Sequence, residues 1–263
     1  MIYKEYIRQL ARNRKREDGR EPMEMRKIEI QHNPFSRPEG SALIKMGDTV
    51  LVSGVKMEVG EPFPDSPDAG ILMVGAEFSP IASPEFESGP PQEDSIELAR
   101  VVDRGIRESK AIDMEALCIK PREKTWMVMI DIQILNHDGN LIDAAALASA
   151  AAIANTKMPA YEDDKVNYEK RNKSLPVKHK PIAVSFAKIE GNIFMDPTFA
   201  EEAVMDGGIV ITVRDDGNVN SIQMLGNGGF SQSEIESLID TAVEKSKEMR
   251  VFTEKSTKVM EFL

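Results

Sequence analysis

Residues 135–155, LNHDGNLIDAAALASAAAIAN, constrain the fold more than any other part of the sequence. They combine the end of a strand, a tight turn at Asp138-Gly139 and a helix dominated by alanine. Alanine has the highest helix propensity, and its small side chain lets a helix approach a neighbouring helix or sheet closely. We therefore predict a tightly packed helix over 141–156, which Pro159 prevents from continuing.

The turn before this helix has the shape of a phosphate-binding loop. Backbone N–H groups and the positive end of the helix dipole are both available at such a helix start. The next three residues are Asn140, Leu141 and Ile142, so no Arg, Lys, Ser or Thr side chain is offered to an anion. The segment therefore has the backbone of a phosphate site without its side-chain chemistry, and a purely structural strand-turn-helix is the alternative.

Strand-like segments followed by a long helix occur twice along the chain. The predicted strands are 43–45, 49–59, 70–78 and 126–135 in the first half and 182–190, 194–196, 208–214 and 219–225 in the second. The strand at 126–135 is expected to be buried on both faces. The other predicted helices cover the first 20 residues, the stretch 95–112 behind a capping box of Asp94 and Glu97, and 231–252. This pattern predicts an α+β fold with two similar strand-helix halves.

The net charge of −11 is distributed very unevenly along the chain. Residues 57–99 contain no Lys or Arg, and their ten acidic residues account for most of the excess negative charge. Basic residues gather instead at 8–16 and 165–180. Such asymmetry indicates local binding faces, so the bulk charge does not exclude RNA, and the acidic stretch favours a basic partner in a hetero-oligomer.

The remaining composition excludes several classes of protein. The single cysteine, Cys118, cannot form an internal disulfide and suits a reducing cytoplasm, so we expect a cytoplasmic protein. The N-terminal segment lacks the apolar core of a signal peptide, and no apolar run approaches the roughly 20 residues that cross a bilayer. The three histidines lack metal-ligand spacing, and the glycine-rich stretch 226–229 lacks the pattern of a nucleotide-binding loop. No membrane contact, metal or cofactor is therefore expected.

Five segments in order resemble the RNase PH family of phosphorolytic exoribonucleases. They are GREPMEMRKIEI (19–30), GSALIKMGDTVLVSGVK (40–56), IELARVVDRGIRES (96–109), LNHDGNLIDAAALASAAA (135–152) and PIAVSFAKIEGNIFMDPTFAEE (181–202). The resemblance implies an RNase PH-like fold, also described as ribosomal protein S5 domain 2-like. It divides the chain into a basic N-terminal helix and leading segment (1–27), an N-terminal half (28–160), a basic loop (161–180) and a C-terminal half ending in a long helix (181–263).

Within the family, the sequence is most similar to the non-catalytic RNase PH-like ring subunit of the archaeal exosome. The resemblance implies a 3′-to-5′ phosphorolytic exoribonuclease complex in which such subunits alternate with a catalytic RNase PH-like paralogue in a hetero-hexameric ring. Single-stranded RNA would thread towards the catalytic site at each shared interface, and RNA-binding cap subunits would complete the complex.

Three departures from the family pattern predict that this chain is not catalytic by itself. Active relatives have two adjacent arginines where this chain has Glu93 and Asp94. An Arg that follows their phosphate loop is matched by Leu141 or Ile142, and an acidic residue before a Met-Pro is matched by one of residues 173–174. Because phosphorolysis needs a cationic site for inorganic phosphate, exchanging cations for anions would repel it.

Three arginines are the candidate RNA-binding residues. Arg100, Arg104 and Arg107 fall within a stripe about 60° wide on one helix face. Guanidinium groups suit phosphate oxygens, and in the silent exosome subunits that this chain resembles, arginines of this helix contact the RNA backbone. The alternative is a solvated face whose arginines only form i,i+4 pairs with acidic neighbours. The basic cluster within 170–180 (Lys170, Arg171, Lys173, Lys178 and Lys180) is a second, weaker candidate for RNA or subunit contact.

Three functions remain in competition at this point. The first is a non-catalytic subunit that scaffolds the ring, helps to bind RNA and shapes the active site of the catalytic partner. The second is a self-sufficient phosphorolytic exoribonuclease whose active residues have moved. The third is an unrelated small-molecule α/β protein that shares only the fold, and it predicts no affinity for RNA.

Overall fold

The larger of two main β-sheets carries the first half of the chain. The computed structural model describes residues 2–254. The strands of this sheet lie in the order β1-β2-β3-β6-β4, and β5 pairs with β6. They are β1 (Ile28–His32), β2 (Gly40–Met46), β3 (Thr49–Gly60), β4 (Ile71–Phe78), β5 (Cys118–Lys120) and β6 (Lys124–Asn136). Among the described strands of this sheet, β4 alone runs parallel to its neighbour β6, and no strand within residues 2–254 pairs with its other edge.

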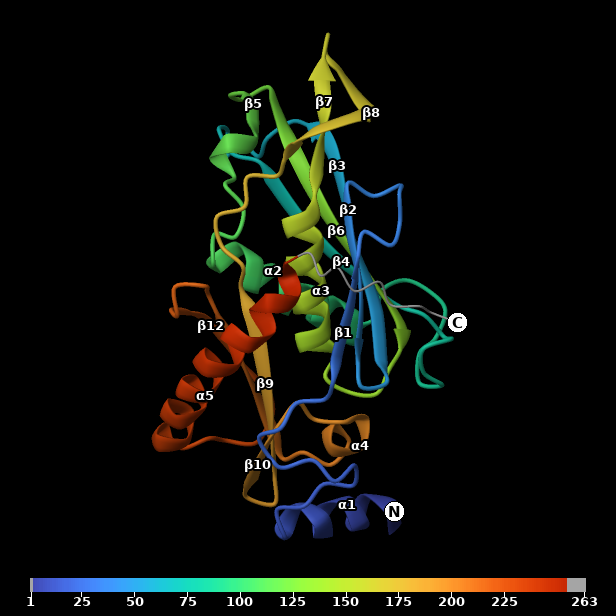
Figure 1. Cartoon of the computed structure of the whole chain (residues 1–263), viewed down its shortest axis with the longest axis vertical. Helices are drawn as coiled ribbons and strands as arrows, with labels where there is room; N and C mark the ends of the chain where they lie inside the picture. Colours follow the sequence, from blue (N-terminus) through green and yellow to red (C-terminus); the bar gives the residue numbers. More distant parts are fainter. Residues whose placement is uncertain (1, 255–263) are drawn as a thin grey trace.

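The second sheet is antiparallel and belongs to the second half of the chain. Its order is β10-β9-β11-β12, formed by β9 (Ile182–Ile189), β10 (Asn192–Met195), β11 (Gly207–Val213) and β12 (Val219–Gly226). The α-helices are α1 (Ile2–Arg12), α2 (Glu93–Glu108), α3 (Leu141–Asn155), α4 (Phe199–Glu202) and α5 (Gln232–Arg250), and two short 3-10 helices are η1 (Glu115–Leu117) and η2 (Val251–Thr253). Two sheets with segregated helices confirm the predicted α+β class and its two strand-helix halves (Figure 1).

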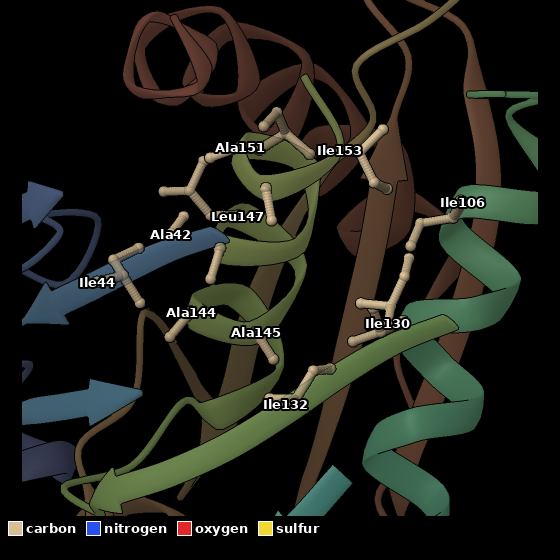
Figure 2. Close-up of a cluster of buried hydrophobic side chains, with 14 of the residues drawn as sticks. Ala42, Ile44, Ile106, Ile130, Ile132, Ala144, Ala145, Leu147, Ala151 and Ile153 are labelled. Atoms are coloured by element: carbon tan, nitrogen blue, oxygen red, sulfur yellow. The ribbon is translucent and has the colours of Figure 1, made fainter. Parts of the chain in front are cut away.

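Helix α3 lies at the centre of the molecule and joins the two sheets. Six of its alanines are buried, and it contacts β2 and β3 on one side and β9 on the other. In Figure 2, Ala144, Ala145 and Leu147 of α3 point into the same cluster as Ile44 and Ile132 from the first sheet. The predicted alanine-rich helix is therefore confirmed, because only small side chains allow one helix to pack against two sheets.

The close approach of α3 to the first sheet is visible at Gly40. A Cβ atom there would lie 2.3 Å from Thr156 Oγ1 and 2.5 Å from the carbonyl oxygen of Ala152. Both are far below van der Waals contact, so a larger residue at Gly40 would force the end of α3 away from β2.

The prediction that residues 126–135 are buried on both faces was wrong. Side chains of β6 alternate: Val128, Ile130 and Ile132 are fully buried, whereas Asp131 between them is exposed. The buried set faces α2 and α3, as Figure 2 shows for Ile130, Ile132 and Ile106. Helices cover only this face, so the other face of the sheet carries polar and half-buried side chains.

Two helix boundaries in the structure differ from the predicted ones, the end of α1 and the start of α2. Helix α1 ends at Arg12 and not near residue 20, because Arg14 adopts a left-handed conformation with φ of 55°. Helix α2 begins at Glu93 after Gln92, whose side chain makes no capping hydrogen bond, so the predicted capping box of Asp94 and Glu97 does not form. The final helix does begin as predicted after Ser231, where a complete capping box is present.

The predicted basic loop 161–180 is largely a β-hairpin. Strands β7 (Lys157–Glu162) and β8 (Lys165–Ser174) pair antiparallel around a turn at Asp163-Asp164, whose φ angles of 51° and 59° fit a tight hairpin turn. The hairpin forms the upper end of the molecule in Figure 1, opposite α1. Its polar strands carry no apolar alternation, so sequence periodicity could not reveal them.

Long-range contacts hold this hairpin in place. Arg171 donates to the carbonyl oxygens of Ser36, Arg37 and Pro38 at 3.1, 2.9 and 2.8 Å. The same guanidinium lies 3.1 Å from the fully buried carboxylate of Glu39. Arg171 therefore attaches β8 to the loop before β2, which an isolated two-stranded ribbon needs for stability.

Candidate nucleic-acid interface

The three candidate arginines all lie on the exposed side of α2. Arg100, Arg104 and Arg107 are exposed, whereas Leu98 and Val102 on the other side of the helix are buried in the core. The predicted segregation of the two faces is thus present, and it follows from the amphipathic spacing of apolar residues in this segment.

The arginines differ in how strongly other groups engage them. Arg107 donates to both carboxylate oxygens of Asp103, at 2.7 and 3.0 Å, and to the carbonyl oxygen of Leu72 at 3.2 Å. Hydrogen bonding to Asp103 raises the pKa of Arg107. At this position the structure shows the i,i+4 ion pair that the sequence offered as the alternative to RNA binding. Arg107 must therefore release Asp103 before it can bind a phosphate.

The other two arginines are more available. Arg104 does not pair with Glu108 and donates to the side-chain oxygen of Gln223 on β12 at 3.2 Å. Arg100 is 77% exposed in its side chain, and its nearest carboxylate, that of Glu97, is 4.0 Å away. Both line a cavity of about 540 Å³ between α2 and the edge of the first sheet, whereas Arg107 lines a separate cavity of about 330 Å³.

The turn before α3 has the expected shape, but a group of the chain itself occupies it. Asn140 is the N-cap of α3 in a left-handed conformation, with φ of 49°. Its backbone N–H donates to the carboxylate of Glu202 on α4 at 2.8 Å. The N–H group that a phosphate loop would offer to its ligand is therefore taken by a carboxyl group of the chain itself.

The backbone before α4 closes the same turn sterically. Gly139 has φ of 83°, and a Cβ atom at this position would lie 2.4 Å from the backbone nitrogen of Phe199. Leu141 is buried and Ile142 packs against the hydrophobic core, so both have become packing residues. The chain thus keeps the strand-turn-helix backbone while residues 197–199 cover the place where an anion would approach.

The start of α2 is acidic, as the sequence predicted. Glu93 and Asp94 are exposed there. Asp94 lines a cavity of about 570 Å³ together with Glu77, Glu85 and Glu87. Four carboxylates and no cation line this cavity, so it would repel inorganic phosphate.

Comparison with known proteins identifies the family. The model of the 3′ exoribonuclease family matches the chain in two parts, domain 1 over residues 24–159 and domain 2 over residues 179–245. The chain belongs to this family, the RNase PH family. The resemblance derived from the sequence motifs is confirmed, and so is the RNase PH-like fold.

Relatives within the RNase PH family are similar over nearly the whole chain. The exosome complex component Rrp42 of Thermococcus kodakarensis is 43% identical over 258 residues, covering 95% of this chain and 93% of the relative. Rrp42 of Archaeoglobus fulgidus is 45% identical, with 95% of each protein covered. A subunit in the solved structure of the Archaeoglobus fulgidus exosome with RNA bound to the active site superposes with a TM-score of 0.89 at 44% identity, covering 95% of this chain and 97% of that one.

The basic residues within 170–180 are mostly engaged by neighbouring groups. Lys170 pairs with Glu162, Lys178 with Asp113 and Lys180 with Glu254. Arg171 attaches the hairpin, as described above. Within residues 2–254, Lys173 is the member of this cluster without an ion pair, so the cluster offers an RNA strand fewer available charges than its sequence indicates.

A buried ionic cluster beside the closed loop was not found from the sequence. Asp196 accepts hydrogen bonds from Arg26 at 2.7 and 3.0 Å, from Arg20 at 2.9 Å and from the side chain of Asn140 at 2.8 Å. Burial opposes ionisation of Asp196, but Arg26 outweighs it and holds the pKa below its usual value. Arg26 and Asp196 are 170 residues apart in sequence, so no local spacing indicates their pairing.

Asp143 is a second buried carboxylate at the start of α3. It accepts hydrogen bonds from the hydroxyl and the backbone N–H of Ser185 at 2.6 and 2.9 Å and from the side chain of Asn140 at 2.9 Å. Burial nevertheless raises its pKa from 3.8 to about 7. Glu202, which faces the same loop, also has its pKa raised by burial to about 7.

These raised pKa values predict how stability depends on pH. The folded protein keeps a proton on Asp143 that the unfolded chain releases between about pH 4 and 7. The contribution of Asp143 is therefore fully present below its unfolded pKa and is lost as the pH rises through 7. We expect the free energy of unfolding, measured by urea titration at pH 5, 6 and 7, to fall with pH, and to fall less steeply in an Asp143→Asn variant. Equal slopes for the two proteins would contradict the assignment.

Proposed function

We propose that this chain is a non-catalytic subunit of an archaeal-type exosome, a 3′-to-5′ phosphorolytic exoribonuclease complex. It scaffolds a hetero-hexameric ring in alternation with a catalytic RNase PH-like paralogue, and it helps to shape that partner's active site. The observation that carries the proposal is the closed loop before α3, where the carboxylate of Glu202 takes the Asn140 N–H. Exosome components named Rrp42 are 43–45% identical over 95% of this chain, and this similarity supports the assembly.

The same proposal assigns RNA binding to α2. Arg100, Arg104 and Arg107 contact phosphates of single-stranded RNA on its way to the partner's catalytic site, and RNA-binding cap subunits complete the complex. Exposure of all three guanidinium groups on one helix face supports this role. They bind without reading bases, because phosphate contacts carry no sequence information. We place this function in the cytoplasm. A separate observation is that residues 2–254 contain no helix with the length and apolar composition of a membrane span.

The test compares three samples: this chain alone, its catalytic paralogue alone, and the two mixed. Each is incubated with phosphate and single-stranded RNA, and nucleoside diphosphate release is followed together with mass in solution. We expect this chain to be inactive alone, to form a large ring with the paralogue and to raise the activity of that partner. Phosphate-dependent degradation by this chain alone would contradict the proposal and favour the self-sufficient exoribonuclease.

A further inference from the structure

The cavity beneath Arg100 and Arg104 has the size and lining of a ligand site. Its volume of about 540 Å³ lies within the range of small-molecule pockets, about 300–1,000 Å³. Apolar groups of α2 and β4 line part of it, including Ile96, Ala99 and Val74. Such groups can contact the face of a flat ring.

Part of the cavity is open because Gly75, a β4 residue that lines it, has no side chain. Gly75 lies opposite Asp131 in the β4–β6 register, and a Cβ atom at Gly75 would lie 3.7 Å from the Asp131 carboxylate. A single carbon therefore fits there without a clash, but a larger side chain at this position would extend into the open space. Gly75 thus offers a substitution that fills the cavity without altering its charged groups.

Asp131 supplies an acceptor for which this chain provides no donor. Its carboxylate lines the cavity, and no donor among residues 2–254 lies within hydrogen-bond distance of it. Burial, followed by the nearby charge of Glu77, raises the pKa of Asp131. A ligand with an N–H group directed at this oxygen would gain a charge-assisted hydrogen bond, which is about twice as strong as a bond between neutral groups.

One side of the cavity rim has a fixed cation. The Gln223 amide donates to the carbonyl oxygen of Met224 at 3.3 Å, which leaves its oxygen to accept from Arg104 at 3.2 Å. Asn220 of the same strand donates to the carbonyl oxygen of Gly105 at 3.1 Å and links β12 to α2. The second half of the molecule thereby holds the Arg104 guanidinium beside the cavity.

We propose that this cavity binds one nucleobase of the single-stranded RNA whose phosphates contact Arg100 and Arg104. The base lies against Ile96 and Ala99, and its exocyclic amino group donates to Asp131. This inference rests on the proposed RNA-binding role of α2. It adds a preference for adenine and cytosine over uracil, which phosphate contacts cannot give. Adenine and cytosine carry an amino group that can donate to a carboxylate. Uracil carries a carbonyl oxygen at that edge, and a carboxylate repels this oxygen.

The test measures dissociation constants of the ring assembled with the catalytic paralogue, at one salt concentration, for oligo(A), oligo(C) and oligo(U) of equal length. We expect the ratio of oligo(U) to oligo(A) dissociation constants to fall about fivefold in Asp131→Ala, the equivalent of one hydrogen bond. Gly75→Leu should weaken all three oligonucleotides. Glu58→Ala, which removes an exposed carboxylate of the same sheet outside the cavity, should leave the ratio unchanged.

The outcomes separate failure of this inference from failure of the proposed function. An unchanged ratio in Asp131→Ala, while Arg104→Ala still weakens RNA binding, would overturn the base site alone. If an Arg100→Ala, Arg104→Ala double variant binds RNA as tightly as the unmodified ring, the RNA-binding role of α2 itself is overturned. If Gly75→Leu prevents ring assembly and leaves no ring to titrate, the cavity receives a side chain of the partner subunit, and the base site is likewise overturned.

Discussion

Replacing Asp196 with alanine should lower the free energy of unfolding by about 3–5 kcal/mol, as is typical when one partner of a buried ion pair is removed. Asp196 is fully buried and accepts hydrogen bonds from Arg26, Arg20 and Asn140. Its removal leaves the buried Arg26 guanidinium without its main counter-charge, in a place that water reaches poorly. Urea unfolding monitored by circular dichroism at pH 7 measures the change.

A matched control is available on the surface of the same half. Asp216 lies in the turn between β11 and β12, pairs with Arg214 and is 38% exposed in its side chain. Asp216→Ala removes the same carboxylate but should cost less than about 1 kcal/mol, because exposed ion pairs contribute little. Similar losses for the two variants would contradict the prediction that burial makes the ion pairs of Asp196 costly to break.

Replacing Arg100, Arg104 and Arg107 together by alanine should weaken RNA binding by the assembled ring about tenfold or more and flatten its salt dependence. Each phosphate contact on a single strand contributes about 0.7 to the slope of log affinity against log salt, so loss of three should reduce the slope by about 2. Fluorescence anisotropy of a labelled oligonucleotide between about 0.05 and 0.3 M salt measures both quantities. Among the single variants, Arg107→Ala should have the smallest effect, since Asp103 already neutralises Arg107.

The control for this prediction removes three positive charges elsewhere. Lys27, Lys120 and Lys247 are exposed and lie outside both candidate RNA-binding clusters. Their triple alanine variant changes the net charge by the same amount but should leave the salt slope unchanged. If both triple variants flatten the slope equally, the effect is one of overall charge, and α2 has no special role in RNA binding.

Local sequence patterns were sufficient for much of the fold. The alanine-rich α3, the amphipathic α2 and most strands of the two main sheets follow from side-chain periodicity and turn residues within windows of about ten to twenty residues, whereas β1 and β5 were not predicted from these patterns. The same patterns placed the three arginines together on one exposed face of α2. These features are local, because helix faces and strand faces are set by neighbours three, four or two residues away.

The features that decide the chemistry came from contacts between distant residues. Sequence alone showed that Leu141 and Ile142 cannot bind phosphate, but not that Glu202 takes the Asn140 N–H, 62 residues away in sequence. Nor could periodicity find β8, whose polar strand is held by Arg171 across more than 130 residues. The sequence by itself determined the long helices, most strands of the two main sheets and the departures from the family's catalytic residues. Tertiary structure decided which carboxylates are buried and which arginines remain available, because burial and ion pairing depend on segments that meet only in the folded chain.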